Sequence, residues 1–132
     1  MQEGGTLVAD EVVSGVAFNC KGIVYNNEKN VTLSPGTTVN FTKGLKWEFS
    51  YGQFKSGTTG DNPAAAPVIL QGQSGLEWSG ISLSFCPNVE IYNTAFSNIK
   101  NNNTALTLSN VSEYYISNNT FDLTNLDSVR AT

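Results

Sequence analysis

The chain has 132 residues, of which 14% are charged and 39% hydrophobic, and its formal net charge is -4, so one domain around one core is expected. It contains no histidine and a single arginine, Arg130, which excludes imidazole catalysis, histidine-ligated metal sites and arginine phosphate clamps. Its 7 cationic side chains are scattered among 11 acidic ones, so we expect no nucleic-acid partner. We also expect no metal and no cofactor, and no run approaches the roughly 20 apolar residues of a membrane span.

Short runs in which apolar residues alternate with other residues follow one another from residue 7 to residue 123. A period of two residues predicts β-strands, and asparagine runs such as 101–103 favour turns between them. In chain order the predicted strands are Leu7–Ala9, Val16–Phe18, Ile23–Tyr25, Val31–Leu33, Val39–Phe41, Leu45–Phe49, Gly52–Phe54, Val68–Leu70, Leu76–Trp78, Ile81–Leu83, Val89–Ile91, a strand at Phe96, Leu106–Leu108, Tyr114–Ile116 and a strand at Phe121.

Three segments lie between or after these strands. Ser34-Pro35-Gly36-Thr37 predicts a tight corner, because Pro fixes φ at the first turn position and Gly accepts the positive φ that follows. Residues 55–66 are rich in Gly and Pro and lack alternation, so they predict a loop. Residues 124–132 are mostly polar and predict a tail, with 1–132 forming a single domain or a piece of a longer solenoid.

A shift by 25 residues, from 81 to 106, preserves residue class at a set of positions, which indicates a solenoid repeat. The matched residues are Ile81 and Leu106, Leu83 and Leu108, Ser84 and Ser109, Val89 and Tyr114, Ile91 and Ile116, Asn93 and Asn118, and Phe96 and Phe121. The two asparagines are expected at equivalent corners, where they either form a ladder of stacked amides or adopt left-handed backbone conformations.

Followed backwards, the strands fall into three series, which predict an all-β parallel β-helix of about five coils with three short strands each. A β-sandwich would explain the strands but not the constant shift. The first series is 16–18, 39–41, 68–70, 89–91 and 114–116; the second is 7–9, 31–33, 52–54, 81–83 and 106–108; the third is 23–25, 45–49, 76–78, Phe96 and Phe121.

The sequence resembles the right-handed parallel β-helix proteins of the pectate-lyase-like superfamily. The resemblance is carried by 31–41 (VTLSPGTTVNF), Pro67–Leu70 and Trp78–Ile81, which are similar to opening coils, and by 89–96 and 114–121, which are similar to later repeats. It implies a right-handed fold and a secreted or cell-surface location. Such folds carry lyases, hydrolases, adhesins and structural proteins, so the fold alone selects no activity.

One pair of carboxylates is a weak candidate for catalysis. A glycosidase needs two carboxyl groups about 5 to 10 Å apart, and the predicted series place Glu48 and Glu77 outward on adjacent coils. The alternative is a solvated charged face with Lys46 as the counter-ion. A lyase of the resembled superfamily commonly uses an Arg or Lys base beside aspartates that hold calcium, but Arg130 lies in the predicted tail.

The best predicted ligand patch is on the outer surface of the later coils. Tyr92 and Tyr115 are expected outward on neighbouring coils, with Glu90, Asn93 and Asn118 nearby. Tyrosines with amide groups suit polysaccharide or glycan binding, although exposed tyrosines also simply cover strand surface. Trp47 and Trp78 share the parity of Leu76 and other apolar residues, so they are expected in the core.

Cys20 and Cys86 are expected either to form a disulfide or to be two buried thiols. Because strand edges at the ends of a solenoid are unpaired, homo-oligomeric or end-to-end assembly is a further expectation. The sequence therefore predicts a non-catalytic extracellular or surface β-helix module for adhesion, carbohydrate contact or assembly. The alternatives are a fragment of a polysaccharide lyase or glycoside hydrolase, and a self-assembling structural or filament subunit.

Overall fold

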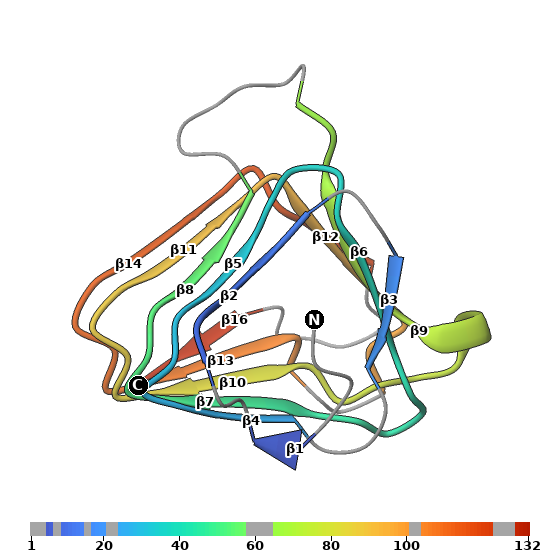
Figure 1. The fold of residues 1–132 in the computed structure, drawn as a ribbon. Helices are drawn as coiled ribbons and strands as arrows, with labels where there is room; N and C mark the ends of the chain where they lie inside the picture. Colours follow the sequence, from blue (N-terminus) through green and yellow to red (C-terminus); the bar gives the residue numbers. More distant parts are fainter. Residues whose placement is uncertain are drawn as a thin grey trace.

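The computed structural model describes residues 5–6, 9–14, 17–20, 24–57, 65–100, 104–122 and 129–132. Within these residues the chain is all-β, apart from a short 3-10 helix, η1 (Gln73–Gly75). The described strands form three sheets, named A, B and C below, and pair in parallel. Each sheet takes every third strand, and the sheets form the sides of a triangle (Figure 1). This architecture is consistent with a β-helix-like solenoid.

The order of strands within each sheet follows their order in the chain. Sheet A contains β1 (Gly5–Thr6), β4 (Val24–Asn27), β7 (Trp47–Ser50), β10 (Ile81–Ser84), β13 (Leu106–Ser109) and β16 (Val129–Ala131). Sheet B contains β2 (Glu11–Val13), β5 (Val31–Leu33), β8 (Phe54–Ser56), β11 (Val89–Tyr92) and β14 (Tyr114–Ser117). Sheet C contains β3 (Ala17–Cys20), β6 (Thr38–Phe41), β9 (Val68–Gly72), β12 (Thr94–Ser97) and β15 (Thr120–Asp122).

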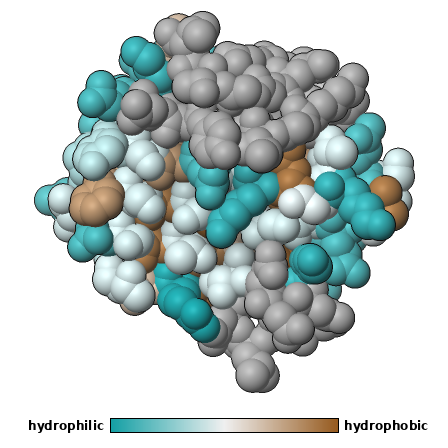
Figure 2. All heavy atoms as spheres, turned by 90° about the horizontal axis from the view of Figure 1, so that it is seen from below, coloured by the Kyte–Doolittle hydropathy of each residue, from teal (hydrophilic) through white to brown (hydrophobic). Residues whose placement is uncertain are grey.

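The core fills the space between the three sheets. Alternate residues of the strands are buried, as the sequence alternation predicts, while the residues between them lie on the outer surface. The prediction that Trp47 and Trp78 belong to the core is confirmed, because both are fully buried. Phe41 stacks on Trp78 with 4.0 Å between ring centroids and 6° between planes. Where the face seen in Figure 2 is coloured by hydropathy, it is largely hydrophilic or intermediate.

Left-handed backbone conformations mark the corners between sheets. Gly36 has φ +83, and the amide of Thr37 donates to the carbonyl of Ser34 at 3.2 Å, which confirms the predicted tight corner. Asn93 and Asn118 also have positive φ, of 46 and 57. Asparagine tolerates this region better than most residues, since its short polar side chain makes local hydrogen bonds.

The predicted alternation of buried and exposed residues is confirmed, but the predicted assignment of strands to the three series is wrong after Val68–Leu70. The 25-residue shift itself is confirmed by the pairing of Ile81 with Leu106, of Val89 with Tyr114 and of Phe96 with Phe121. The predicted first series, however, continued from sheet C to 89–91, which lies in sheet B beside Phe54. The cause is segment 73–80, which carries η1 and contributes one isolated bridge, Trp78 to Ile99, where a strand was predicted. Leu76, expected in the core, is 49% exposed.

Two predicted boundaries also change. Lys55, predicted to begin a loop, lies in β8, and residues 58–64 of that loop lie outside the described residues. Residues 124–132 were predicted to be a tail, but Val129–Ala131 form β16, in which Arg130 pairs with Thr107 of β13. The predicted strand starts at Leu7, Val16 and Ile23 lie outside the described residues.

Candidate functional site

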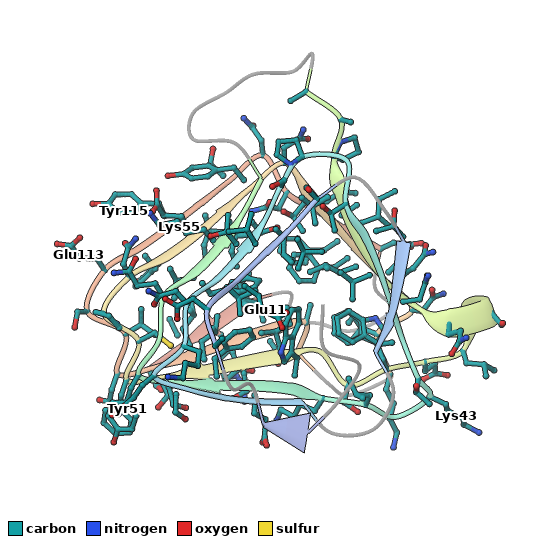
Figure 3. The ribbon with its side chains drawn as sticks, in the orientation of Figure 1. Glu11, Lys43, Tyr51, Lys55, Glu113 and Tyr115 are labelled. Carbon is teal, nitrogen blue, oxygen red and sulfur yellow. The ribbon has the colours of Figure 1, made fainter. Side chains whose placement is uncertain are left out.

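A straight row of side chains crosses the outer face of sheet B. The parallel register places one residue from each strand in this row, which we call the sheet B row: Val12, Thr32, Lys55, Glu90 and Tyr115. Val12 is 75% exposed and Tyr115 is 52% exposed, so an apolar and an aromatic side chain occupy its two ends. Figure 3 shows Lys55 and Tyr115 on this outer face. The row combines an aromatic ring with charged and hydroxyl groups.

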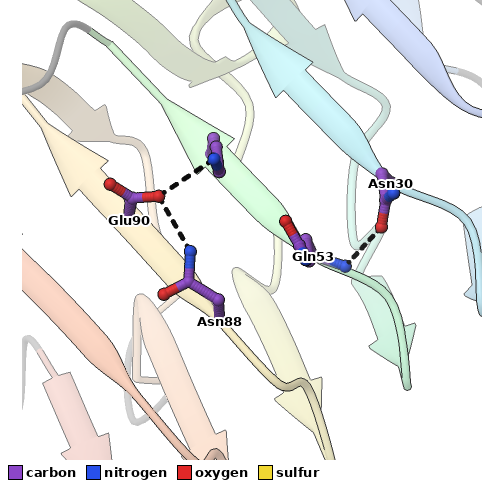
Figure 4. Close-up of polar contacts among 5 residues, drawn as sticks. Asn30, Gln53, Asn88 and Glu90 are labelled. Atoms are coloured by element: carbon purple, nitrogen blue, oxygen red, sulfur yellow. Dashed lines mark hydrogen bonds and ion pairs between the residues drawn. The ribbon is translucent and has the colours of Figure 1, made fainter.

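The two charged groups in the middle of the row contact each other, and Asn88 beside the row contacts one of them. Lys55 Nζ lies 3.2 Å from Glu90 Oε2, and Asn88 Nδ2 donates to the same oxygen at 2.8 Å (Figure 4). The Lys55 side chain is 45% exposed, so the ion pair itself contributes little, on the order of 0.2 to 1 kcal/mol. Its main effect is to fix the Glu90 carboxylate next to Tyr115.

A second polar row runs along the edge where the chain enters sheet B. The backbone amide of Asn30 donates to Asp10 Oδ1 at 2.8 Å, and the amide of Gln53 donates to Asn30 Oδ1 at 2.9 Å (Figure 4). Each side chain thus accepts a hydrogen bond from the backbone of the next strand along. These residues join neighbouring strands, which assigns them a structural role.

The predicted tyrosine pair is only partly brought together. Tyr115 lies opposite Glu90, whereas Tyr92 lies opposite Ser117, so the two rings are offset by two positions on adjacent strands. Tyr92 is half-buried and Tyr115 is exposed. The sequence therefore identified the right strands, but the neighbour of Tyr115 in the row is a carboxylate.

The predicted asparagines have backbone roles. Asn93 Nδ2 donates to the carbonyl of Ala65 at 3.0 Å. Of the two expectations for Asn93 and Asn118, the left-handed backbone conformation is confirmed at both. A neighbouring residue that the sequence did not single out makes the link between strands. Asn119 accepts from the amide of Thr94 and donates to the carbonyl of Ile91, both at 2.9 Å.

Glu48 and Glu77 do not occupy equivalent positions on adjacent strands, so the predicted arrangement of this pair is wrong. Glu48 lies in β7 with Ser82 and Tyr25 as its register partners. Glu77 lies in the segment before Trp78, where its carbonyl accepts from the amide of Gly44 at 2.8 Å. It lines an open pocket of about 340 Å³ with other residues of the corner between sheets C and A. The lining residues are Lys43, Gly44, Gly75, Leu76, Glu77 and Lys100.

Cys86 is a buried free thiol, so the disulfide to Cys20 is not formed. Burial raises the pKa of the Cys86 thiol, although hydrogen bonds with the backbone of Ser84 and Tyr51 act in the opposite direction. Its Sγ lies 3.6 Å from the carbonyl oxygen of Ser84. A buried thiol with a raised pKa is a weak nucleophile, because the thiolate is the reactive form.

A group of exposed residues at the corner where the chain leaves sheet A was not predicted from the sequence. Ser50, Ser84 and Ser109 end three neighbouring strands in register, and the next residue of each is exposed: Tyr51, Phe85 and Asn110. Asn27 pairs with Ser50, so Glu28 completes the set, which we call the corner column. The repeated serine was the available signal, because it aligns the residues that follow it.

No group of three or more His, Cys, Asp or Glu side chains suited to a metal ion occurs in the described part of the chain. Nor does any helix among those residues have the length and apolar character to cross a membrane. Comparison with protein-family models, curated proteins and solved structures gave no match.

Proposed function

We propose that this chain is a right-handed parallel β-helix of the pectate-lyase-like type, with about five coils of three strands. We further propose that it is a non-catalytic module, secreted or on a cell surface, that contacts carbohydrate through the outer face of sheet B. The observation that carries the proposal is the sheet B row, in which the exposed ring of Tyr115 lies beside a fixed carboxylate.

The chemistry of the row suits a saccharide. An aromatic ring contacts the C–H face of a sugar, and carboxylate, ammonium and hydroxyl groups hydrogen-bond with its hydroxyls. Parallel strands hold these groups at fixed spacings of about 4.8 Å, so little conformational entropy is lost on binding. Tyr92 lies in β11, and Asn93 and Asn118 directly follow β11 and β14, so all three flank this surface.

A glycan array tests the carbohydrate proposal, and the chain provides a matched control. Tyr115→Ala is expected to remove the array signal, because it deletes the exposed ring of the row. Tyr114→Ala is expected to retain it, since Tyr114 is similarly exposed at 51% but pairs with the inward-facing Val89. An array without signal, or equal loss in both variants, would contradict the proposal.

The non-catalytic part has its own test. Incubation with neutral and acidic polysaccharides is expected to release neither new reducing ends nor unsaturated products, because Glu48 and Glu77 occupy unrelated positions. Turnover that Glu48→Gln or Glu77→Gln abolishes would establish the enzymatic alternative instead.

End-to-end assembly is a second candidate function, favoured by the last strands of two sheets. Among the described strands, β14 and β15 each pair on one side only. Tyr114, at an inward position of β14, is half exposed. Assembly predicts that sedimentation velocity shows oligomers that grow with protein concentration and that Tyr114→Lys reduces them. A single monomer peak at every concentration would rule this function out.

A further inference from the structure

The corner column consists of the four residues that follow the neighbouring strands β4, β7, β10 and β13. Glu28, Tyr51, Phe85 and Asn110 all have left-handed backbone conformations, with φ of 65, 67, 54 and 52. All four side chains are exposed. The column therefore runs across the strands at the corner between sheets A and B, with Tyr51 pointing outward from that corner (Figure 3).

Backbone hydrogen bonds fix the residues of the column relative to one another. The amide of Glu28 donates to the carbonyl of Ser50 at 2.9 Å, and that of Tyr51 to Ser84 at 3.1 Å. The same contact recurs from Phe85 to Ser109 at 2.9 Å. Glu28, Tyr51 and Phe85 thus each bond to the strand end that precedes the next residue of the column, so backbone hydrogen bonds link these positions.

The left-handed backbone conformation does not explain why aromatic residues occupy two of these positions. A left-handed conformation costs a residue with a side chain roughly 1 to 2 kcal/mol, and bulky residues rarely adopt it. At the next corner the equivalent left-handed positions are occupied by Gly57, Asn93 and Asn118, which are residue types that tolerate it. The core gives no explanation either, because Tyr51 is 55% exposed and Phe85 is 51% exposed.

The rings of Tyr51 and Phe85 stack on one another across neighbouring strands. Their centroids are 5.4 Å apart and their planes differ by 13°, so they are stacked. Stacking contributes on the order of 0.5 to 1.5 kcal/mol, which offsets part of the backbone cost but does not require the rings to remain half exposed. Strained, exposed residues on a rigid scaffold are typical of binding surfaces.

The polar ends of the column specify the ligand chemistry. The carboxylate of Glu28 lies at one end and the carboxamide of Asn110 at the other, with the rings between them. Three strand spacings of about 4.8 Å give the column a length of roughly 14 Å. Rings contact the C–H faces of sugars, while carboxylate and amide groups hydrogen-bond with hydroxyls. We propose that the corner column is a second saccharide-binding site, which takes an oligosaccharide laid along the solenoid axis.

Affinity electrophoresis in gels containing xylan, mannan, β-glucan or polygalacturonate tests the site against neutral and acidic sugars of different linkage. The double variant Tyr51→Asn, Phe85→Asn removes both rings and keeps residues that accept positive φ, so we expect it to fold. In the gel that retards the parent protein, the double variant is expected to bind the polysaccharide at least tenfold more weakly. Its thermal unfolding midpoint is expected to stay within a few degrees of the parent's. Tyr51→Phe, which keeps the ring, is expected to bind like the parent protein.

The same gels distinguish the two proposed sugar-binding sites. Loss of retardation in Tyr115→Ala with full binding by the Asn double variant would overturn the corner site and support the sheet B row. The reverse result would support the corner site and overturn the row. Absence of retardation in all four gels, or equal binding by the parent and the double variant, would overturn the corner site.

Discussion

At the scale of single residues, the two tryptophans show how similar core side chains differ in their polar contacts. Trp78 Nε1 donates to the carbonyl of Ser97 at 2.7 Å. Trp47 is equally buried, but its Nε1 has no hydrogen-bond partner among the described residues. Trp47 packs on Phe49 and Phe54 instead. The two positions therefore respond differently to removal of the indole N–H.

Trp78→Phe is expected to lower the free energy of unfolding by about 1 kcal/mol more than Trp47→Phe. Both changes remove similar ring volume, but only the first breaks a hydrogen bond and leaves the Ser97 carbonyl unpaired. Urea unfolding followed by circular dichroism measures the difference. Equal losses, or a larger loss for Trp47→Phe, would show that the indole hydrogen bond contributes nothing.

Cys86 makes stability depend on pH in the alkaline range. Burial raises its pKa in the folded state, so above the ordinary thiol pKa of about 8.5 the unfolded chain binds fewer protons than the folded one. The free energy of unfolding contributed by this group therefore falls as pH rises. We expect Cys86→Ala to flatten the decline in stability between pH 8 and pH 10. A decline as steep as that of the parent would exclude Cys86 as its source.

At the scale of elements, the corners set how closely neighbouring strands approach. A Cβ at Gly57 would overlap the backbone carbonyl of Tyr92, whereas a Cβ at Gly44 would meet nothing within 4 Å. Both glycines have positive φ, of +80 and +76. The two glycines thus have similar backbone conformations, but only Gly44 has space for a Cβ atom.

Gly57→Ala is accordingly expected to destabilise the fold by at least about 3 kcal/mol, through conformational strain and overlap together. Gly44→Ala should cost only the conformational part, about 1 kcal/mol. Differential scanning calorimetry of the two variants separates these contributions. If both lowered the unfolding midpoint equally, overlap with Tyr92 would not be a factor.

The same elements show what the sequence could and could not predict. Alternation located most strands, and the 25-residue shift paired β10–β12 with β13–β15 correctly. Apolar pairs look alike in all three sheets, however, so the pattern does not say to which sheet a strand belongs. That information lies in backbone pairing and is lost where a segment such as 73–80 changes the spacing. The Glu48 and Glu77 hypothesis followed from this error.

The corner column was missed for a related reason. Exposed aromatic residues carry no periodic signal of their own, and Tyr51 and Phe85 are 34 residues apart, which the 25-residue shift does not align. Only the register of Ser50 with Ser84 brings them together. Tyr115 and Glu90, by contrast, lie 25 residues apart, so the sequence located them on adjoining strands.

At the scale of the whole molecule, stability is built up between neighbouring strands. In such an arrangement each repeat contacts only the repeats beside it, so inner repeats are held from both sides and outer ones from one side. Sheet B illustrates this, since β8 pairs with β5 and β11, whereas β2 and β14 each have one partner among the described strands.

Amide hydrogen exchange is expected to reveal a gradient across the parallel strands of sheet B. The amide of Phe54, which donates to Asn88 beside β11, should exchange at least tenfold more slowly than that of Val89, which donates to Glu113 beside β14, because local opening is easier where a strand has one neighbour. Nuclear magnetic resonance resolves the individual amides. Uniform exchange from β2 to β14 would indicate that the chain opens only as a single cooperative unit.

The straight register of the sheet B row has a consequence for what can bind along it. Its side chains are spaced at regular intervals of one strand, about 4.8 Å. They belong to Val12, Thr32, Lys55, Glu90 and Tyr115. A polymer whose repeat length matches this interval can contact every side chain of the row. A polymer with a different repeat length loses this match after a few units. Selection by periodicity would then discriminate between chains built from the same chemical groups.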